Sequence, residues 1–154
     1  MRVPPMSQKL AHRIEQAEIR VLRKRLEVLR RLAGNPLGVE IEQVGNAALF
    51  SIEGISGPSF NKVLGISSEH VSQLDSIIQF YQDKQNGCQL EIIPEHNNRK
   101  LFQSLSKKGF FQSGFRTVLY GVPSQQAINN STVTVNKMFP MFCAFLNKGS
   151  PSAY

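Results

Sequence analysis

Residues 60–121 read FNKVLGISSEHVSQLDSIIQFYQDKQNGCQLEIIPEHNNRKLFQSLSKKGFFQSGFRTVLYG. The apolar residues of this stretch are spaced in the order strand, helix, strand, helix, strand. Residues 60–66 are a short apolar run typical of a strand, and Ser67 or Ser68 can cap the helix that follows. Strands that alternate with helices of these lengths predict an α/β (α+β) fold, a mixed sheet flanked by helices.

The second half of the stretch repeats this pattern. Residues 89–93 are typical of a buried strand, and Pro94 prevents its continuation. Asn97 or Asn98 can cap a helix that ends at Gly109, and residues 111–122 form the last predicted strand. The expected inward residues of this part are aromatic and aliphatic: Leu101, Phe102, Leu105, Phe110, Phe111 and Phe115.

Before residue 60, the sequence predicts a long helix and a hairpin. Apolar residues recur at three- and four-residue steps over residues 7–33, which indicates an amphipathic helix that Gly34 and Pro36 end. Its expected apolar positions are Leu10, Ile14, Ala17, Val21, Leu22, Leu26, Val28, Leu29 and Leu32. Over residues 39–53, the dipeptide Gly45-Asn46 separates two apolar segments, which is typical of a hairpin with a primed turn.

The chain of 154 residues is long enough for one domain with a core, which we place at residues 1–123. The net charge of +7 is unevenly placed, since residues 1–34 hold nine Lys/Arg against three Glu. Cys88 and Cys143 show no metal-site or disulfide spacing, so no metal is expected and a reducing cytoplasm is the expected location. No apolar run reaches the ~20 residues that a membrane-spanning helix needs, so no membrane partner is expected.

Residues 124–154 differ from the rest of the chain. Residues 124–132 are a polar linker, and the apolar residues 138–146 could cover an exposed sheet edge or form a sticky tail. We expect residues 124–154 to be poorly ordered. The exposed edge and the apolar segment together predict a homo-oligomer.

Several short segments resemble the GNAT family of N-acetyltransferases. The order of elements in residues 60–121 resembles strands four to six of that fold, and the helix that ends in Lys107-Lys108-Gly109-Phe110 resembles its recurrent helix-Gly-Phe segment. Residues 12–18, 34–36, 60–65, 80–81 and 114–121 further resemble the N-terminal half of bacterial proteins built from two GNAT-like halves. The resemblance covers about residues 10–123.

The resemblance implies an enzyme that transfers an acetyl group from acetyl-CoA to an amine. In such enzymes, a loop of the pattern Gln/Arg-x-x-Gly-x-Gly/Ala binds the coenzyme pyrophosphate through backbone amides and a helix N-terminus. The equivalent loop here contains Ser67, Ser68 and Glu69, without a second glycine and with a negative charge in the first helical turn. This loop is therefore degenerate, and we expect no tight binding of acetyl-CoA.

The resemblance also leaves the catalytic role unfilled. The tyrosine that often protonates the departing thiolate aligns with Leu105, so no catalytic residue is assigned. In the two-halved family, the coenzyme-binding loop belongs to the C-terminal half, which we expect to be missing here through truncation or a shifted reading frame. The acceptor substrate is not specified by the sequence.

The alternative function is a non-enzymatic interaction module. The basic cluster of the N-terminal helix could contact a protein or nucleic acid, although a solvated helix face is the more frequent explanation and nucleic acid is not expected. His12, His70 and His96 lie on separate elements and are expected to be surface or capping residues. Glu40 and Glu42 are expected to form a solvated strand face.

Overall fold

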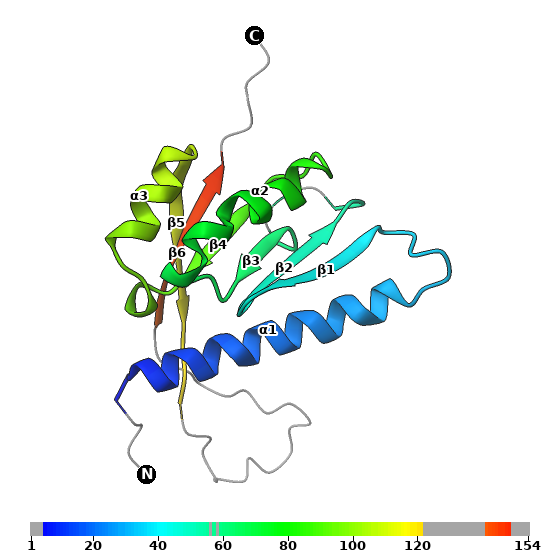
Figure 1. Ribbon diagram of the computed structural model, residues 1–154. Coiled ribbons are helices and arrows are strands. Elements are labelled where there is room, and N and C mark those ends of the chain that lie inside the picture. The colour runs from blue at the N-terminus through cyan, green and yellow to red at the C-terminus, as the bar shows by residue number, and fades with distance from the viewer. Residues whose placement is uncertain (1–4, 56, 58, 122–140, 149–154) are drawn as a thin grey trace, which may run out of the picture.

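The computed structural model describes residues 5–55, 57, 59–121 and 141–148, the last of these as backbone. These residues form one sheet with a long helix on one face and two helices on the other (Figure 1). In chain order, the elements are α1 (Gln8–Arg30), β1 (Val39–Val44), β2 (Ala47–Ile52), β3 (Lys62–Leu64), the 3-10 helix η1 (Ser68–Gln73), α2 (Leu74–Gln82), β4 (Gln89–Ile92), the 3-10 helix η2 (Pro94–His96), α3 (Arg99–Lys107), β5 (Phe110–Val118) and β6 (Met141–Lys148).

The sheet is mixed, with the strand order β1-β2-β3-β4-β6-β5. Among the described strands, β3 and β4 are the parallel pair, and η1 and α2 connect them. All other neighbouring strands are antiparallel. The predicted fold class, a mixed α/β domain, is confirmed.

β2 shows why helices cover both faces of the sheet. All six of its residues are buried, and successive side chains of a strand point to opposite faces. Ala47 and Leu49 pack in a core with residues of α2 and α3, whereas Ala48, Phe50 and Ile52 pack in a second core with residues of α1. The sheet is therefore the middle layer of three, with α1 on one face and α2 and α3 on the other.

The predicted N-terminal helix is present, and part of its predicted apolar stripe packs against the core, with Ile14 and Leu26 buried and Leu10, Leu22 and Leu29 partly buried. α1 ends at Arg30, before the expected residue 33, and Gly34 follows with a φ of 75°. Its buried apolar residues are Ala11, Ile14, Ile19 and Leu26, whereas Ala17, Val21, Val28 and Leu32 are exposed. The predicted stripe was therefore partly wrong, because the helix buries the line of Ala11, Glu15 and Ile19 and leaves Ala17, Val21 and Val28 in water. Ile14 and Leu26 are buried as predicted.

The predicted hairpin over residues 39–53 is confirmed. In the β1–β2 register, Val44 pairs with Ala47, which leaves Gly45 and Asn46 as a two-residue loop. Gly45 has a φ of 57°, the positive value that a primed turn needs at its first loop position.

The end of the chain differs most from expectation. Residues 141–148 form β6, which pairs with β4 on one side and β5 on the other, where residues 124–154 were expected to be poorly ordered. An apolar segment of eight residues can fill a gap between two strands because its backbone groups then pair on both sides. The predicted linker over residues 124–132 lies outside the described residues.

Three predicted core residues are exposed. Phe110 is buried, but Phe111 and Phe115 are 54% and 65% exposed, and Phe102 is also exposed. Phe111 and Phe115 lie on β5, which is the outermost strand on its side of the sheet. An edge strand has a neighbouring strand on one side only, so fewer groups surround its side chains than those of β2.

Candidate functional site

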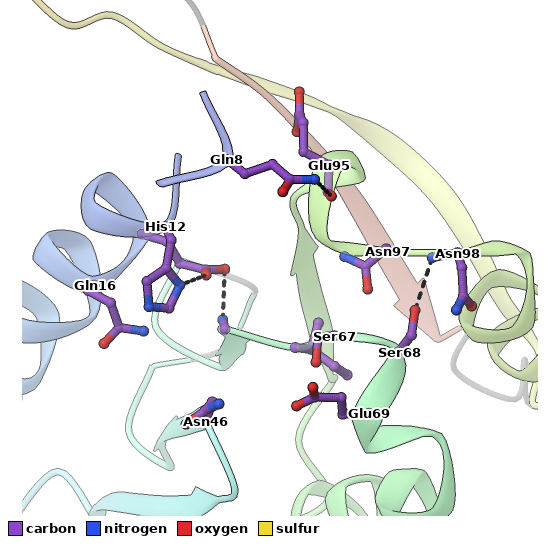
Figure 2. A pocket seen from close by; sticks show the side chains of 13 residues that line it. Gln8, His12, Gln16, Asn46, Ser67, Ser68, Glu69, Glu95, Asn97 and Asn98 are labelled. Atoms are coloured by element: carbon purple, nitrogen blue, oxygen red, sulfur yellow. Dashed lines mark hydrogen bonds and ion pairs between the residues drawn. The ribbon is translucent and has the colours of Figure 1, made fainter. Parts of the chain in front are cut away.

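A cavity lies beyond the carboxyl ends of the parallel strands β3 and β4. The two strands are paired over a short length, in which Lys62 lies opposite Gln89 and Val63 lies opposite Leu90. Ligands commonly bind beyond the carboxyl ends of parallel strands. The cavity has a volume of about 530 Å³ and is shown in Figure 2. Its lining comes from α1, the β1–β2 turn and the two loops that follow β3 and β4: Gln8, His12, Glu15, Gln16, Asn46, Gly65, Ile66, Ser67, Ser68, Glu69, Glu95, Asn97 and Asn98.

Glu15 is the most deeply buried ionisable residue of this lining. Its side chain enters the cavity wall from α1, and the residue is only 8% exposed. One carboxylate oxygen, Oε1, accepts a hydrogen bond from the backbone N–H of Gly65 at 3.1 Å. The other, Oε2, lies 3.9 Å from Nδ1 of His12.

Burial changes the acidity of this carboxyl group. The pKa of Glu15 is raised to about 7, chiefly because burial removes the carboxylate from water. The charges of Glu18 and Glu91 act in the same direction, and the Gly65 hydrogen bond acts in the opposite one. Near neutral pH, the group is therefore divided between its protonated and ionised forms. A carboxyl group in this state can act as a proton acceptor or as the counter-ion of a cation.

The position of Gly65 requires glycine. Its φ is 77°, and a Cβ atom there would lie 2.6 Å from the carbonyl oxygen of Asn46. The loop after β3 therefore passes directly against the β1–β2 turn. This close approach brings the Gly65 N–H into reach of Glu15.

The predicted degenerate loop lines the cavity, and its polar groups are bonded to one another. The Ser67 N–H donates to Nδ1 of His70 at 3.0 Å, and the Ser67 hydroxyl lies 3.1 Å from the same atom. The Asn98 N–H donates to the Ser68 hydroxyl at 2.9 Å (Figure 2). His70 is buried, so its ring fills the space behind the loop. The prediction that His70 has a capping role is confirmed.

The lining of the cavity carries negative charge. Three carboxylates belong to it, those of Glu15, Glu69 and Glu95, whereas its described lining contains no Lys or Arg. His12 is its one residue that can become cationic. Carboxylates repel phosphate groups, so the lining disfavours an anionic ligand.

Four charged residues, of which Glu91 is the buried one, lie between α1 and the sheet, beside a second cavity of about 990 Å³. Glu91 on β4 is 1% exposed, and its Oε1 accepts a hydrogen bond from Lys62 at 2.6 Å. Its Oε2 lies 2.8 Å from Arg116, an ion pair without the geometry of a hydrogen bond. Arg116 donates to both carboxylate oxygens of Glu18 on α1, at 2.7 and 2.5 Å. These four residues tie α1 to the sheet.

The remaining predicted residues lie apart from the cavity. Leu105, which aligns with the general-acid tyrosine of the GNAT family, is buried in the core between α3 and the sheet. Glu40 forms an ion pair with Lys84 at 3.0 Å, and Glu42 is exposed on the same strand. The His96 side chain lies outside what the structure describes.

Sequence reasoning missed Glu15, although the sequence holds a signal for it. Ala11, Glu15 and Ile19 follow one another at four-residue steps, so they share one side of the helix. A glutamate between two residues that prove to be buried is unusual and requires a partner. This glutamate was overlooked because the predicted apolar stripe of the helix ran through Leu10, Ile14, Ala17 and Val21.

Within the described ranges, no group of three or more His, Cys, Asp or Glu side chains could hold a metal ion. The same ranges contain no helix that is long and apolar enough to cross a membrane. No protein-family model matches the chain, and neither the curated proteins nor the solved structures include a significant match.

Proposed function

We propose that this chain is a GNAT-like domain related to enzymes that transfer an acetyl group from acetyl-CoA to an amine, and that it does not hold acetyl-CoA by itself. The support comes from the order β3, α2, β4, α3, β5, which is the order that the sequence resemblance implies. Further support is the position of the cavity, beside the loop that aligns with the family's phosphate-binding loop.

The observation that carries the proposal is the closed state of this loop. A phosphate-binding loop offers backbone N–H groups to an anion. Here the Gly65 N–H donates to Glu15, and the Ser67 N–H donates to His70. Glu69 lies at the same loop and adds a negative charge. A pyrophosphate would have to replace two internal hydrogen bonds and approach three carboxylates.

Isothermal titration calorimetry with acetyl-CoA tests this proposal. We expect no binding tighter than about millimolar, which corresponds to only ~4 kcal/mol. A parallel titration with 3′-phosphoadenosine 5′-diphosphate, which keeps the pyrophosphate of the coenzyme without its pantetheine arm, tests the phosphate contacts alone. Micromolar binding of acetyl-CoA would contradict the proposal.

A second candidate is an interaction module that uses α1. The observation in its favour is the outer face of the helix, where exposed basic residues lie next to exposed Val21 and Val28. Fluorescence anisotropy with labelled DNA at low and moderate salt would test its nucleic-acid form, since phosphate contacts weaken steeply with salt. Absence of any salt-dependent signal would exclude that form.

We also propose a cytoplasmic location. It is supported by the sequence, in which Cys88 and Cys143 show neither metal-site nor disulfide-framework spacing. Fractionation of cells that express the tagged chain would test it, and recovery in an extracellular or membrane fraction would contradict it.

A further inference from the structure

We propose that the outer face of α1 binds an acidic amphipathic helix of a partner protein. This face consists of a line of aliphatic side chains, Ala17, Val21 and Val28, and of the exposed cations beside it. The inference rests on the second candidate function, an interaction module that uses α1, and names the kind of partner that such a module takes. It does not depend on the resemblance to acetyltransferases.

The first reason is the line of aliphatic side chains, which the described part of the protein leaves uncovered. Ala17, Val21 and Val28 follow one another at steps of four and seven residues, so they lie on one side of the helix. All three are exposed, Val21 by 50% and Val28 by 65%. Figure 1 shows α1 across one face of the sheet, where Ile19 and Leu26 are buried. The exposed line is therefore a second apolar side of α1, with the spacing of the narrow seam between two packed helices.

The second reason is the positive charge beside this line. The exposed cations that accompany it along the helix are Arg13, Arg20, Lys24, Arg25 and Arg31. Among the described residues, no carboxylate forms an ion pair with any of them. Of the Glu residues of α1, Glu15 is buried, Glu18 is bound to Arg116, and Glu27 is partly exposed. Charges beside a helix–helix seam select the partner, so the partner helix should carry acidic residues there.

The third reason is the hollow beside the first half of the line. The cavity of about 990 Å³ is lined by Ala17 and Val21 on the side of the helix. Apolar side chains line it from the side of the sheet as well, those of Phe60, Leu64 and Val118. Amphipathic helices that dock in grooves insert large apolar side chains as anchors. This cavity offers space for such an anchor next to the seam.

This face fits a helix better than it fits a bilayer or a nucleic acid. Helices that lie in a membrane interface carry a wide apolar face with Trp, Phe or Leu. α1 contains no Trp, Phe or Tyr, and its larger apolar side packs on the sheet. Contacts to nucleic-acid phosphates need cations and gain nothing from a line of aliphatic side chains between them. A helix with an aliphatic seam and acidic flanks matches both features of the face.

The test is fluorescence anisotropy of a labelled synthetic helix of about four heptads, with Leu at its a and d positions and Glu at its flanking e and g positions. Repulsion between the Glu side chains keeps this peptide from pairing with itself at neutral pH. A second peptide has the same composition, and therefore the same charge, in an order without the heptad repeat. We expect saturable binding of the first peptide and at least tenfold weaker binding of the second. Equal binding of the two peptides, or no saturation by the first, would overturn the proposal.

Substitutions in the protein test the location of the contact. Val21→Ser and Val28→Ser are introduced together, and because both side chains are exposed the fold should persist, which circular dichroism checks. We expect the affinity for the heptad peptide to fall at least tenfold in this variant. It should stay unchanged in Phe102→Ser, which removes an exposed apolar side chain of α3 on the other face of the sheet. Equal losses in the two variants would contradict the assignment to α1.

Two other occupants are outcomes of the same experiment. Vesicles of phosphatidylcholine and phosphatidylserine and a DNA duplex are titrated with the protein at the same salt concentration. We expect both to bind more weakly than the heptad peptide. Tighter binding of either would overturn the proposal, and tighter binding of the duplex would support the nucleic-acid form of the second candidate function instead. Calorimetry with acetyl-CoA concerns the loop at Ser67 and not α1, so the two proposals fail independently.

Discussion

The carboxylate of Glu15 on α1 accepts a hydrogen bond at 3.1 Å from the backbone N–H of Gly65, a residue 50 positions later in the chain. This contact joins the N-terminal helix to the loop that begins the cavity. It is made possible by a glycine that no other residue can replace and by a buried acid whose pKa is raised. Substitutions at Glu15 and Gly65 should therefore change the free energy of unfolding.

The first prediction concerns pH. Because the pKa of Glu15 rises from 4.5 to about 7 on folding, the folded chain holds more protons than the unfolded chain between these values. Stability should therefore fall as the pH rises from about 4.5 to about 7, by up to about 3 kcal/mol from this group. Glu15→Gln should remove this fall and be the more stable protein at pH 7.5. Urea denaturation of both proteins at pH 4.5 and 7.5 measures it, and parallel pH profiles would contradict the prediction.

The second prediction concerns Gly65. Gly65→Ala combines an unfavourable positive φ with a Cβ atom 2.6 Å from the Asn46 carbonyl oxygen, so it should cost more than about 2 kcal/mol. Gly109 has a φ of 81° but nothing within 4 Å, so Gly109→Ala should cost only about 1–2 kcal/mol. Gly87→Ala, in open space without a positive φ, should change little. Thermal unfolding of the three variants should rank them in this order.

The hairpin, the helix caps, the buried face of α1 and the strand β6 show which parts of the fold the sequence could predict. Local signals were sufficient where one short segment determines the outcome, as in the hairpin at Gly45-Asn46 and the caps at Ser67 and Asn98. The buried face of α1 and the strand β6 depend on distant partners, because α1 packs on the sheet and β6 lies between β5 and β4, a strand far from it in the sequence. The sequence pointed to the loop of Ser67, Ser68 and Glu69, which lines the cavity, whereas the burial of Glu15 could be recognised only from the fold.

The third prediction concerns the buried charges under α1. Glu91→Gln removes the carboxylate that Lys62 and Arg116 share and leaves two cations close together. Removing one partner of a buried ion pair costs about 3–5 kcal/mol, and we expect a loss in this range. Glu40→Gln is the matched control, since its carboxylate pairs with Lys84 but is 42% exposed, against 1% for Glu91, and this pair should contribute less than about 1 kcal/mol. Equal effects in chemical denaturation would contradict the difference in burial.

The fourth prediction concerns self-association at the edge of the sheet. Among the described strands, β5 pairs with β6 alone and is the last strand of the sheet, and it carries the exposed rings of Phe111 and Phe115. An exposed edge strand with large apolar side chains can pair with the same strand of a second copy. We expect light scattering to show a concentration-dependent dimer, and Phe115→Glu to weaken it at least tenfold through charge repulsion between the two copies. Val28→Glu on α1, which packs against β1 at the opposite edge of the sheet, should leave the dimer intact. A monomer at all concentrations, or an equal effect of both substitutions, would exclude β5 as the contact.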